Sequence, residues 1–516
     1  MSTSTAPAGG ASKPNLVAVI GTTGVGKTDL GVSLAKALAS RSLAPFRGEV
    51  LNHDSMQCYR GLDVITNKAT KDEMDGVPHR LMGFLAPGEE WGVNDFLRDA
   101  MDKIDDLKER DVLPICVGGT TYYLQNLIFP NQLVNDPSAE ASTPCTSLSY
   151  TPRTTNDVHK FPPSLRQAIE TLPEELLTLF LALPCLPQLS TPDDFPHSFP
   201  QHLLPPRLRS PETLTPALFN LLQRIDPSSA ERWHWRDIRK VRRALDIVWE
   251  GRRWEDVVQE QQARPNEGTR FRTLIFWLYA ENEALHPRLD GRVDKMIERG
   301  LLSEIDELWQ TAHEPGAEPT NYSKGIYQAI GYKEFDPYLS LKHRDPSVTL
   351  ENSDALRKLF EQGVESMKVS TRQYAKRQVK WIKSKLMPAV RKLKNEGEVT
   401  VVLLDASDLS RWQENVCDLA VDILNSFLDG KPLPDPCILS PAAALQLARP
   451  GPDSNSAHMK RACPICTRDP QRPVMVEERQ WDGHLKTKTH RIAAQKQRKG
   501  AKAESELRQG SAGVEL

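Results

Sequence analysis

The sequence predicts an α/β fold: a P-loop-containing parallel sheet flanked by helices, with a helical insertion and a small C-terminal zinc finger. The first observation is "LVAVI" at 16–20, which stands directly before "GTTGVGKT" at 21–28 and a run with helical spacing. The second is a helical pattern from Val93 to Glu109 between apolar runs at 49–52 and 112–119. The third is a group of cysteines and histidines near the C-terminus.

Composition and periodicity divide the rest of the chain. Ser, Thr and Pro dominate between 131 and 215, with one apolar helical patch from Glu174 to Leu183. Helical patterns follow at Thr213–Glu250, Leu285–Leu308 and Asp354–Lys394, before the strand pattern "EVTVVLLDA". We expect a disordered N-terminus at 1–14, a P-loop α/β catalytic core at 15–130, a Ser/Pro-rich, partly flexible insertion at 131–215, a helical part that returns to the core at 216–410, a helix and linker at 411–460, a C2H2-type zinc finger at 461–492 and a basic, disordered tail at 493–516.

The composition excludes some classes of protein. The 66 basic and 68 acidic residues leave a net charge of −2, so a polyanionic partner must be met by a local patch. The 8 scattered cysteines are unlike a secreted disulfide framework and indicate a reducing compartment. No apolar run approaches the roughly 20 residues that span a bilayer. The start "MSTSTAPAGGASKPN" lacks the apolar core of a signal peptide, so we expect a cytoplasmic protein, with mitochondrial and nuclear import left open.

The segment "GTTGVGKT" has the spacing GxxxxGK[ST] between a strand and a helix, the context that this phosphate-binding motif requires. Its glycines let backbone N–H groups point at phosphate oxygens, while Lys27 supplies a positive charge. The Thr28 hydroxyl is placed to hold Mg²⁺. A nucleoside triphosphate and any other diphosphate offer the same oxygens, so the motif leaves the ligand open. The loop residues predicted to bind it are Gly21, Thr22, Thr23, Gly24, Val25, Gly26, Lys27 and Thr28.

Two further polar segments follow apolar runs of the predicted sheet. Asp54 in "NHDSMQ" comes after one run, and Thr120 in "VGGTTYYLQNL" comes after another. Because ligands of open α/β sheets sit outside the carboxyl ends of the strands, Asp54 and Thr120 should lie close together beside the phosphate loop. Asp54 can bind Mg²⁺, act as a general base or cap a turn beside Ser55, and its spacing leaves these roles open.

Two helical segments are strongly basic. The stretch from Lys368 to Lys394 carries ten Lys and Arg residues and no acid, which favours contact with a phosphate backbone. Tyr374 and Trp381 within it can stack on bases or form part of a core. The second segment, "DIRKVRRALDIVWEGRRW", can be a solvated basic face or a binding face. Its clustered cations are Arg239, Lys240, Arg242 and Arg243.

The C-terminal segment "CPICTRDPQRPVMVEERQWDGHLKTKTHR" has metal-ligand spacing. A CxxC pair is followed after seventeen residues by two histidines that are separated by five. Zn²⁺ takes four cysteine and histidine ligands in a tetrahedron, and a site with four protein ligands is structural rather than catalytic. The predicted ligands are Cys463, Cys466, His484 and His490.

Seven segments together resemble the eukaryotic tRNA dimethylallyltransferases, also called tRNA isopentenyltransferases. They are "GTTGVGKT", "DSMQCYRGLDVITNKAT", "GVPHRLMGF", "VGGTTYYLQNL", "DIRKVRRALDIVWEG", "GIYQAIGYKEF" and "TRQYAKRQVKWIK", in that order. The resemblance covers roughly residues 15 to 130 and 215 to 410. The segment "W…HLKTKTHR" resembles the matrin or U1-type fingers that bind structured RNA, and eukaryotic members of the family carry such a unit.

The resemblance implies transfer of a dimethylallyl group from dimethylallyl diphosphate to N6 of the adenosine just 3′ of a tRNA anticodon. Asp54 would then be the general base, Gln57 would contact the extruded base, and Thr120 would support the acid and the diphosphate. Lys27 and Thr28 with Mg²⁺ would stabilise the leaving group. The insertion would grip the anticodon arm and the helical part at 216–410 would bind tRNA.

The resemblance also assigns contacts to the basic helices. Arg243 would lie on the diphosphate side of the site, and Lys240 stands where bacterial relatives often carry arginine, a change that loses the bidentate fork. The residues expected to bind tRNA are Asp54, Ser55, Met56, Gln57, Thr120, Arg239, Lys240, Arg242, Arg243, Arg372, Lys376 and Arg377.

Two other functions fit parts of the sequence. A P-loop small-molecule kinase with an RNA-binding zinc-finger appendage would explain "GTTGVGKT", but would not require "DSMQ" or the basic helix after residue 368. A non-enzymatic RNA-binding protein would carry the loop as a relic, against which the intact Lys27, Thr28 and Asp54 argue. The resemblance favours the transferase, with tRNA and dimethylallyl diphosphate as partners, no membrane and a monomeric state.

Overall fold

The structure is a computed structural model. It describes residues 13–130, 155–186, 203–263, 268–313, 322, 325–393, 395, 397–448 and 460–497. The chain divides into two compact units, one formed by Met1–Asn135 and Asn266–Gly451 and the other by Asp136–Pro265 and Pro452–Leu516. The predicted disordered N-terminus, parts of the insertion and most of the tail lie outside the described residues.

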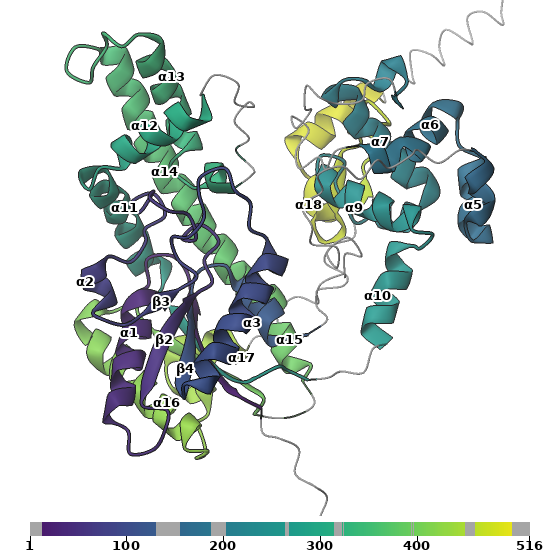
Figure 1. The fold of residues 1–516 in the computed structure, drawn as a ribbon. Helices are drawn as coiled ribbons and strands as arrows, with labels where there is room; N and C mark the ends of the chain where they lie inside the picture. Colours follow the sequence, from purple (N-terminus) through teal and green to yellow (C-terminus); the bar gives the residue numbers. More distant parts are fainter. Residues whose placement is uncertain are drawn as a thin grey trace, which may run out of the picture. The chain divides into compact units, whose positions relative to one another are not determined.

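The first unit is built on a central parallel sheet (Figure 1). Its six strands have the order β3-β2-β4-β1-β5-β6. All of its pairings are parallel, which confirms the predicted fold class. The strands are β1 (Asn15–Gly21), β2 (Arg47–Asn52), β3 (His79–Arg80), β4 (Val112–Val117), β5 (Arg272–Tyr279) and β6 (Val399–Asp405). Because every crossover in a parallel sheet needs a connecting segment, helices cover both faces.

Alternate residues of the strands supply two separate cores. Val17 and Val19 of β1 point to a face covered by α1 and α16, whereas Leu16 and Ala18 point to a face covered by α3, α4 and α17. The helix α3 has the bounds that the sequence predicts. Its apolar residues recur at helical spacing, so all of them pack into the core that Leu16 and Ala18 enter. The helices of this unit are α1 (Lys27–Ala37), α2 (Lys71–Met74), α3 (Val93–Glu109), α4 (Thr121–Ile128), α11 (Asn282–Glu298), α12 (Leu301–Ala312), α13 (Asp336–Arg344), α14 (Asp354–Trp381), α15 (Met387–Arg391), α16 (Leu419–Leu428) and α17 (Pro441–Ala448).

The helices α11 to α14 form an extension beyond the carboxyl ends of the strands (Figure 1). They share a third core, which includes Leu301, Phe335 and Met367, together with Tyr59 and Ile65 from the loop after β2. The extension is therefore packed onto the loop that carries the predicted acid.

The second unit contains helices of the insertion and the cysteine and histidine segment. Its core joins apolar residues such as Leu179, Leu218 and Leu245 from three helices. Its elements are α5 (Pro163–Glu170), α6 (Glu174–Ala182), α7 (Pro211–Ile225), α8 (Pro227–Ala230), α9 (Ile238–Trp249), α10 (Trp254–Ala263), β7 (Lys460–Ala462), β8 (Met475–Glu477) and α18 (Trp481–Leu485). The described part of the Ser/Pro-rich insertion is thus helical and packed.

The structure adds detail to the expected helical middle and to the expected helix and linker. Residues 216–265 belong to the second unit, while the rest of the predicted 216–410 segment belongs to the first. The strand β5 lies within that segment, because its continuous apolar run is buried on both faces of the sheet. The helix α17 lies within the predicted helix and linker at 411–460 and packs on the sheet through Ala443. Across the described residues, no helix combines the length and the apolar character that a membrane span requires.

Candidate active site

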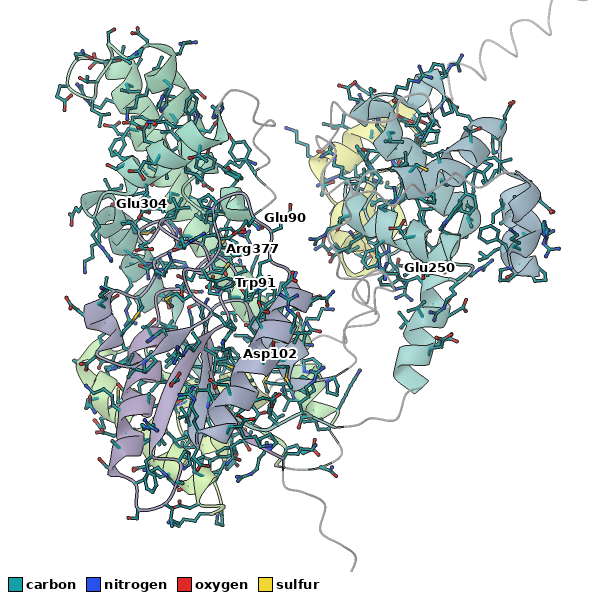
Figure 2. All side chains as sticks on the ribbon, viewed as in Figure 1. Glu90, Trp91, Asp102, Glu250, Glu304 and Arg377 are labelled. Carbon is teal, nitrogen blue, oxygen red and sulfur yellow. The ribbon has the colours of Figure 1, made fainter. Side chains whose placement is uncertain are left out.

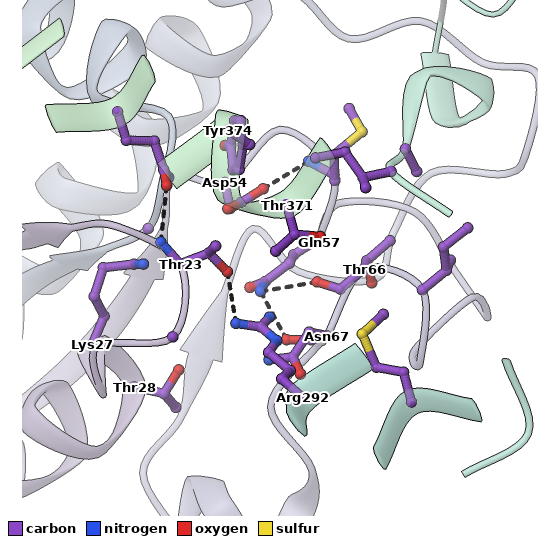
Figure 3. Close-up of a pocket in the computed structure, with 18 of the residues that line it drawn as sticks. Thr23, Lys27, Thr28, Asp54, Gln57, Thr66, Asn67, Arg292, Thr371 and Tyr374 are labelled. Carbon is purple, nitrogen blue, oxygen red and sulfur yellow. Dashed lines mark hydrogen bonds between the residues drawn. The ribbon is translucent and has the colours of Figure 1, made fainter. Parts of the chain in front are cut away.

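A pocket of about 550 Å³ lies in the first unit at the carboxyl ends of β1, β2 and β4. Its walls come from the phosphate loop after β1, the loop after β2, and the helices α11 and α14 (Figure 3). This is the place where open α/β sheets bind ligands, because the loops of neighbouring strands converge there. The structure therefore brings the two strongest sequence segments, "GTTGVGKT" and "DSMQ", to one cavity.

The backbone of the phosphate loop requires glycine at two positions. Gly24 and Gly26 have φ angles of 81° and 84°, which place them in the left-handed region. A Cβ atom on Gly26 would lie 2.4 Å from the ring of Trp412. The loop leads directly into α1, whose N-terminus favours an anion, and Lys27 Nζ donates a hydrogen bond of 2.7 Å to the Thr22 carbonyl.

The predicted loop residues fall into two groups. Gly21, Thr22 and Val25 are buried beside the pocket and support the loop. The others line the cavity itself, and they are Thr23, Gly24, Gly26, Lys27 and Thr28. The Thr28 hydroxyl thus faces the same cavity as Lys27, as a residue that holds Mg²⁺ on a phosphate would require.

Asp54 both caps a turn and faces the pocket. One carboxylate oxygen, Oδ1, accepts a hydrogen bond of 3.0 Å from Met56 N, and Asn52 Oδ1 accepts one of 3.0 Å from Asp54 N. The other oxygen, Oδ2, lies beside Gly119, 2.8 Å from the point where a Cβ atom would stand. Thr120 Oγ1 accepts a hydrogen bond of 3.1 Å from Ser55 N, so Thr120 holds the acid loop through its backbone.

Gln57 is oriented by the returning part of its own loop. Its Nε2 donates to the carbonyl of Asn67 at 3.0 Å and to that of Thr66 at 3.4 Å (Figure 3). Because the amide N–H group is engaged there, the amide oxygen is left for a ligand. The same loop returns to the site, where Ile65, Thr66 and Asn67 line the pocket.

Glu304 of α12 fixes this returning loop from the helical extension. Its carboxylate accepts hydrogen bonds of 2.8 Å from both Val64 N and Ile65 N. Figure 2 labels Glu304 and Arg377, which lie where the extension meets the loops above the sheet. Glu304 has no sequence motif, and we did not predict it.

Two helix residues, the buried Gln378 and the half-buried Arg292, contact the phosphate loop, and sequence reasoning missed both. Gln378 of α14 accepts a hydrogen bond of 2.8 Å from Thr23 N and donates one of 3.1 Å to the Gly119 carbonyl. Arg292 of α11 donates one of 2.6 Å to Thr23 Oγ1. The sequence contains a weak indication for Gln378, because it lies four residues after Tyr374 and therefore on the same face of the predicted helix. For Arg292 the sequence contains no indication of this role.

Burial around the pocket shifts several pKa values, each in the direction that favours the neutral form of the group. Burial below the protein surface lowers the pKa of Lys27 to about 8, and Arg292 lowers it further while Asp54 opposes the change. Burial lowers the pKa of His53, which packs under Gly118, to about 4, so this ring is neutral at neutral pH. Burial also raises the pKa of Tyr374. An anion in the pocket would stabilise the charged form of Lys27.

The cations of α14 that the sequence assigns to RNA have different surroundings. Arg377 lines the pocket, and Lys376 is exposed. Arg372 forms an ion pair with Asp290 of α11, and Lys368 forms one of 2.7 Å with Asp294. The acid-free stretch is therefore partly neutralised by a neighbouring helix, which its own sequence could not reveal. Trp381 is half-buried and packs edge-on against the exposed Tyr122, so its predicted choice between base stacking and a core role stays open.

The basic helix α9 lies in the second unit, whereas the phosphate loop lies in the first. Arg239 and Lys240 are exposed, and Lys240 forms an ion pair of 2.6 Å with Asp237. Arg242 is only 4% exposed, and its guanidinium donates to Asp246 and to the Leu183 carbonyl. The expectation that Arg242 contacts tRNA is corrected, because its charge is used inside the unit. The roles of Arg239, Lys240 and Arg243 stay predictions.

The predicted zinc ligands converge in the second unit. The ligand atoms of Cys463, Cys466, His484 and His490 all lie within 4.8 Å of one another. Their closest approaches are 3.4 Å between Cys466 Sγ and His490 Nδ1 and 3.2 Å between the two histidine nitrogens. A tetrahedron with zinc–ligand bonds of about 2.0–2.3 Å has edges of roughly 3.3–3.8 Å, so these donors fit Zn²⁺.

The cysteine and histidine segment packs on the insertion helices of its own unit. Lys460 N donates a hydrogen bond of 2.9 Å to the Glu231 carbonyl, and Arg472 Nη2 donates one of 2.8 Å to the Glu212 carbonyl. Backbone carbonyls accept both hydrogen bonds. These contacts therefore hold the cysteine and histidine segment in place without requiring particular side chains on the helices.

Fold and pocket together define a P-loop α/β protein whose site can hold a phosphorylated substrate beside a carboxylate. The model of the IPP transferase family matches residues 57–171 and 192–385, which is more than half of the chain. The chain belongs to the IPP transferase family.

Individual relatives agree with this assignment. The chain is 33% identical to a tRNA dimethylallyltransferase of Schizosaccharomyces pombe over 97% of this chain and 99% of that protein. It is 32% identical to the Saccharomyces cerevisiae protein of the same name, over 92% and 91%. A crystal structure of a eukaryotic dimethylallyltransferase acting on tRNA superposes with a TM-score of 0.66 at 29% identity, covering 95% of this chain and 99% of that one.

Proposed function

We propose that this protein is a tRNA dimethylallyltransferase, which transfers the dimethylallyl group of dimethylallyl diphosphate to N6 of the adenosine 3′-adjacent to the anticodon. The observation that carries the proposal is the single pocket in which the phosphate loop, Asp54 and Gln57 meet. A phosphate site and a carboxylate within one cavity suit a reaction that releases diphosphate and removes a proton. The family membership and the names of the relatives support the same activity.

The reaction breaks the bond between the allylic carbon and the diphosphate oxygen, and the electron pair stays on the diphosphate. The N6 lone pair forms the new C–N bond, and Asp54 takes the N6 proton through Oδ2, the oxygen that the turn leaves free. Gln57 accepts a hydrogen bond from the adenine edge with its amide oxygen. Lys27 stabilises the negative charge that develops on the leaving diphosphate.

Mg²⁺ would be held by the Thr28 hydroxyl, which lines the pocket beside Lys27. When bound, it would neutralise part of the diphosphate charge. The chain's own groups supply the rest of the phosphate contacts, through the N–H groups of the loop and the N-terminus of α1.

The target adenosine must leave its stack before it can enter a cavity of this kind. Arg377 lines the pocket and Lys376 lies exposed one residue away, so both are placed for the sugar-phosphate backbone that brings the base in. Arg239, Lys240 and Arg243 on α9 would contact the tRNA through the second unit. We propose a monomer that works in the cytoplasm, with mitochondrial and nuclear pools.

Zn²⁺ would be held by Cys463, Cys466, His484 and His490 as a structural ion, because all four positions are protein ligands. We propose that the finger adds tRNA affinity. Replacing His490 by Ala should release zinc and weaken tRNA binding more than it slows the bound-state reaction. Zinc content, tRNA affinity and the single-turnover rate at saturating tRNA test this, and a large loss of that rate would contradict the proposed role.

One assay tests the proposed activity. The protein is incubated with radiolabelled dimethylallyl diphosphate and unmodified tRNA, and the wild type is compared with Asp54→Ala and Asp54→Asn. We expect label in the wild-type tRNA and a loss of at least about a hundredfold in both variants, since neither can take the proton. Consumption of ATP on a small acceptor without label in tRNA would instead support the kinase.

A further inference from the structure

The helix α4 is buried along its whole length except at Tyr122. Tyr122 is 38% exposed and lies in the first turn of the helix, two residues after Thr120. Thr120 in turn accepts the hydrogen bond from Ser55 N that holds the loop carrying Asp54. A large aromatic side chain is therefore exposed next to the acid loop.

Trp381 continues the wall that α14 contributes to the pocket. Arg377 and Gln378 line the cavity, and Trp381 follows them by four and three residues, so it lies one turn further along the same face of the helix. Its ring packs edge-on against Tyr122, with the ring centroids 5.6 Å apart and an angle of 76° between the planes. Neither ring is among the described residues that line the cavity. Tyr122 and Trp381 therefore form an aromatic pair just outside the pocket.

Packing of the fold does not explain the aromatic pair. Across the described residues, the half-buried Trp381 belongs neither to the three cores of the first unit nor to the partly buried residues that pack on them. The neighbouring Ile382 and, one turn later, Leu386 are both fully buried in the core that Tyr123 of α4 also enters. Each helix thus buries the apolar residue after its aromatic one and keeps the aromatic ring at the core's outer side.

Exposed cations lie close to the aromatic pair in the chain. Lys376, Arg377 and Lys380 are all exposed on α14, within about one turn of Trp381. Proteins bind single-stranded nucleic acid with this combination, because cations meet the phosphates while aromatic rings stack on the bases. The surface therefore favours a nucleotide of single-stranded RNA over a purely ionic ligand.

We propose that Tyr122 and Trp381 stack on a base that flanks the target adenosine in the tRNA. This assignment rests on the proposed function. When the target base leaves its stack and enters the pocket, each flanking base loses a stacking partner. The aromatic pair beside the pocket replaces one of these partners and so offsets part of the free energy that extrusion costs. It binds RNA and takes no part in the transfer of the proton or of the dimethylallyl group.

The test combines variants of the full-length chain with unmodified tRNA and with two tRNAs in which the nucleotide 5′ or 3′ of the target is abasic. Tyr122→Ala should weaken the binding of intact tRNA by about ten- to a hundredfold. Tyr122→Phe keeps the ring and should stay within about twofold of the wild type. On the tRNA that lacks the stacked base, the wild type and Tyr122→Ala should bind equally well. The proposal is wrong if Tyr122→Ala binds intact tRNA normally, or if its loss is the same on all three tRNAs.

A second variant and a matched control accompany this test. Trp381→Leu should also weaken the binding of intact tRNA and lose its effect on the same abasic tRNA. Its unfolding temperature is measured because Trp381 is half-buried, and the exposed Tyr122 carries the test if Trp381→Leu does not fold. Phe46→Ala removes a ring that is 49% exposed directly before β2, at the opposite edge of the sheet from the pocket, and should match the wild type. An equal loss in Phe46→Ala would contradict a specific role of the aromatic pair.

The results also separate this inference from the proposed function. If the wild type transfers the labelled dimethylallyl group to intact tRNA while Tyr122→Ala binds that tRNA normally, only the assignment of the aromatic pair fails. If the wild type neither binds tRNA nor transfers label, the proposed function fails and the assignment fails with it. Inorganic diphosphate should bind Tyr122→Ala and the wild type equally, because Tyr122 lies outside the pocket lining. Weaker diphosphate binding in Tyr122→Ala would contradict a role in RNA stacking alone.

Discussion

The two basic helices have similar charge patterns and very different surroundings. On α14, Gln378 holds the phosphate loop, Arg377 faces the pocket, and Arg372 is paired with Asp290 of α11. On α9, Arg242 is buried with Asp246, while Arg239 is exposed. This comparison shows that a run of Lys and Arg residues predicts a basic helix but not which of its cations are available to a ligand. The acids and carbonyl groups of neighbouring elements decide that.

The largest effect should come from the buried arginine of α9. Arg242→Met leaves Asp246 and the Leu183 carbonyl without their partner, and we expect a loss of about 3 kcal/mol in the unfolding free energy of the second unit. Urea unfolding of the full chain, followed by tryptophan fluorescence, measures this loss. The neighbouring exposed Arg239→Met should stay within about 0.5 kcal/mol of the wild type. Equal stabilities of the two variants would contradict the inference that Arg242 stabilises the fold and Arg239 does not.

The polar contact of α14 is tested by Gln378→Glu. The carboxylate still accepts from Thr23 N, but it cannot donate to the Gly119 carbonyl and it adds negative charge beside the phosphate loop. We expect the single-turnover transfer rate to fall by roughly fiftyfold with little change in tRNA affinity. Gln373→Glu makes the same chemical change at an exposed position of the helix and should stay within about twofold. A fall in tRNA affinity alone would show that α14 acts only on RNA.

The exposed cations of α9 should give a smaller effect. Arg239→Gln and Lys240→Gln are each expected to weaken tRNA binding by about three- to tenfold and to reduce the slope of log affinity against log salt by about 1. Diphosphate affinity should not change. Arg98→Gln is the control, because Arg98 is exposed on α3 and paired with Asp95. A slope that matches the wild type would mean that these residues make no phosphate contact.

The smallest effect concerns proton uptake in the pocket. The pKa of Lys27 lies at about 8 in the folded protein and at 10.5 ordinarily, so the unfolded chain binds more protons between these values. Lys27 therefore makes stability rise with pH across that window. Diphosphate favours the charged amine, so its binding at about pH 8.5 should take up a fraction of a proton. Calorimetry in buffers of different ionisation enthalpy measures the uptake, and Lys27→Met should abolish it; an unchanged uptake would assign the proton elsewhere.

Short segments of the sequence were enough to predict several parts of the structure. The phosphate loop, the helix α3 and the four convergent cysteines and histidines depend on spacing within short segments, so their residues could be identified in advance. The same is true of Asp54, which follows a strand that the sequence predicts. The predicted roles of Asp54 do not exclude one another, because one carboxylate oxygen caps a turn while the other accepts no hydrogen bond from a residue that the structure describes.

Long-range contacts account for what the sequence missed. The strand β5 was not identified between the predicted helical patterns, because an apolar run buried on both sides carries no alternation. Arg242 was assigned to RNA because nothing nearby in the sequence indicates that Leu183 and the insertion core enclose it. Arg372 was treated as free because its acid partner lies on another helix.

The sequence by itself determined the phosphate-binding motif, the acid after β2 and the zinc-type ligand set, since each is a property of neighbouring residues in the chain. Only the tertiary structure decided what completes the site. Arg292 and Gln378 reach Thr23 from positions 269 and 355 residues away in the chain. The physical reason is that a buried polar group must find a partner wherever the fold supplies one, and that partner can come from any part of the chain.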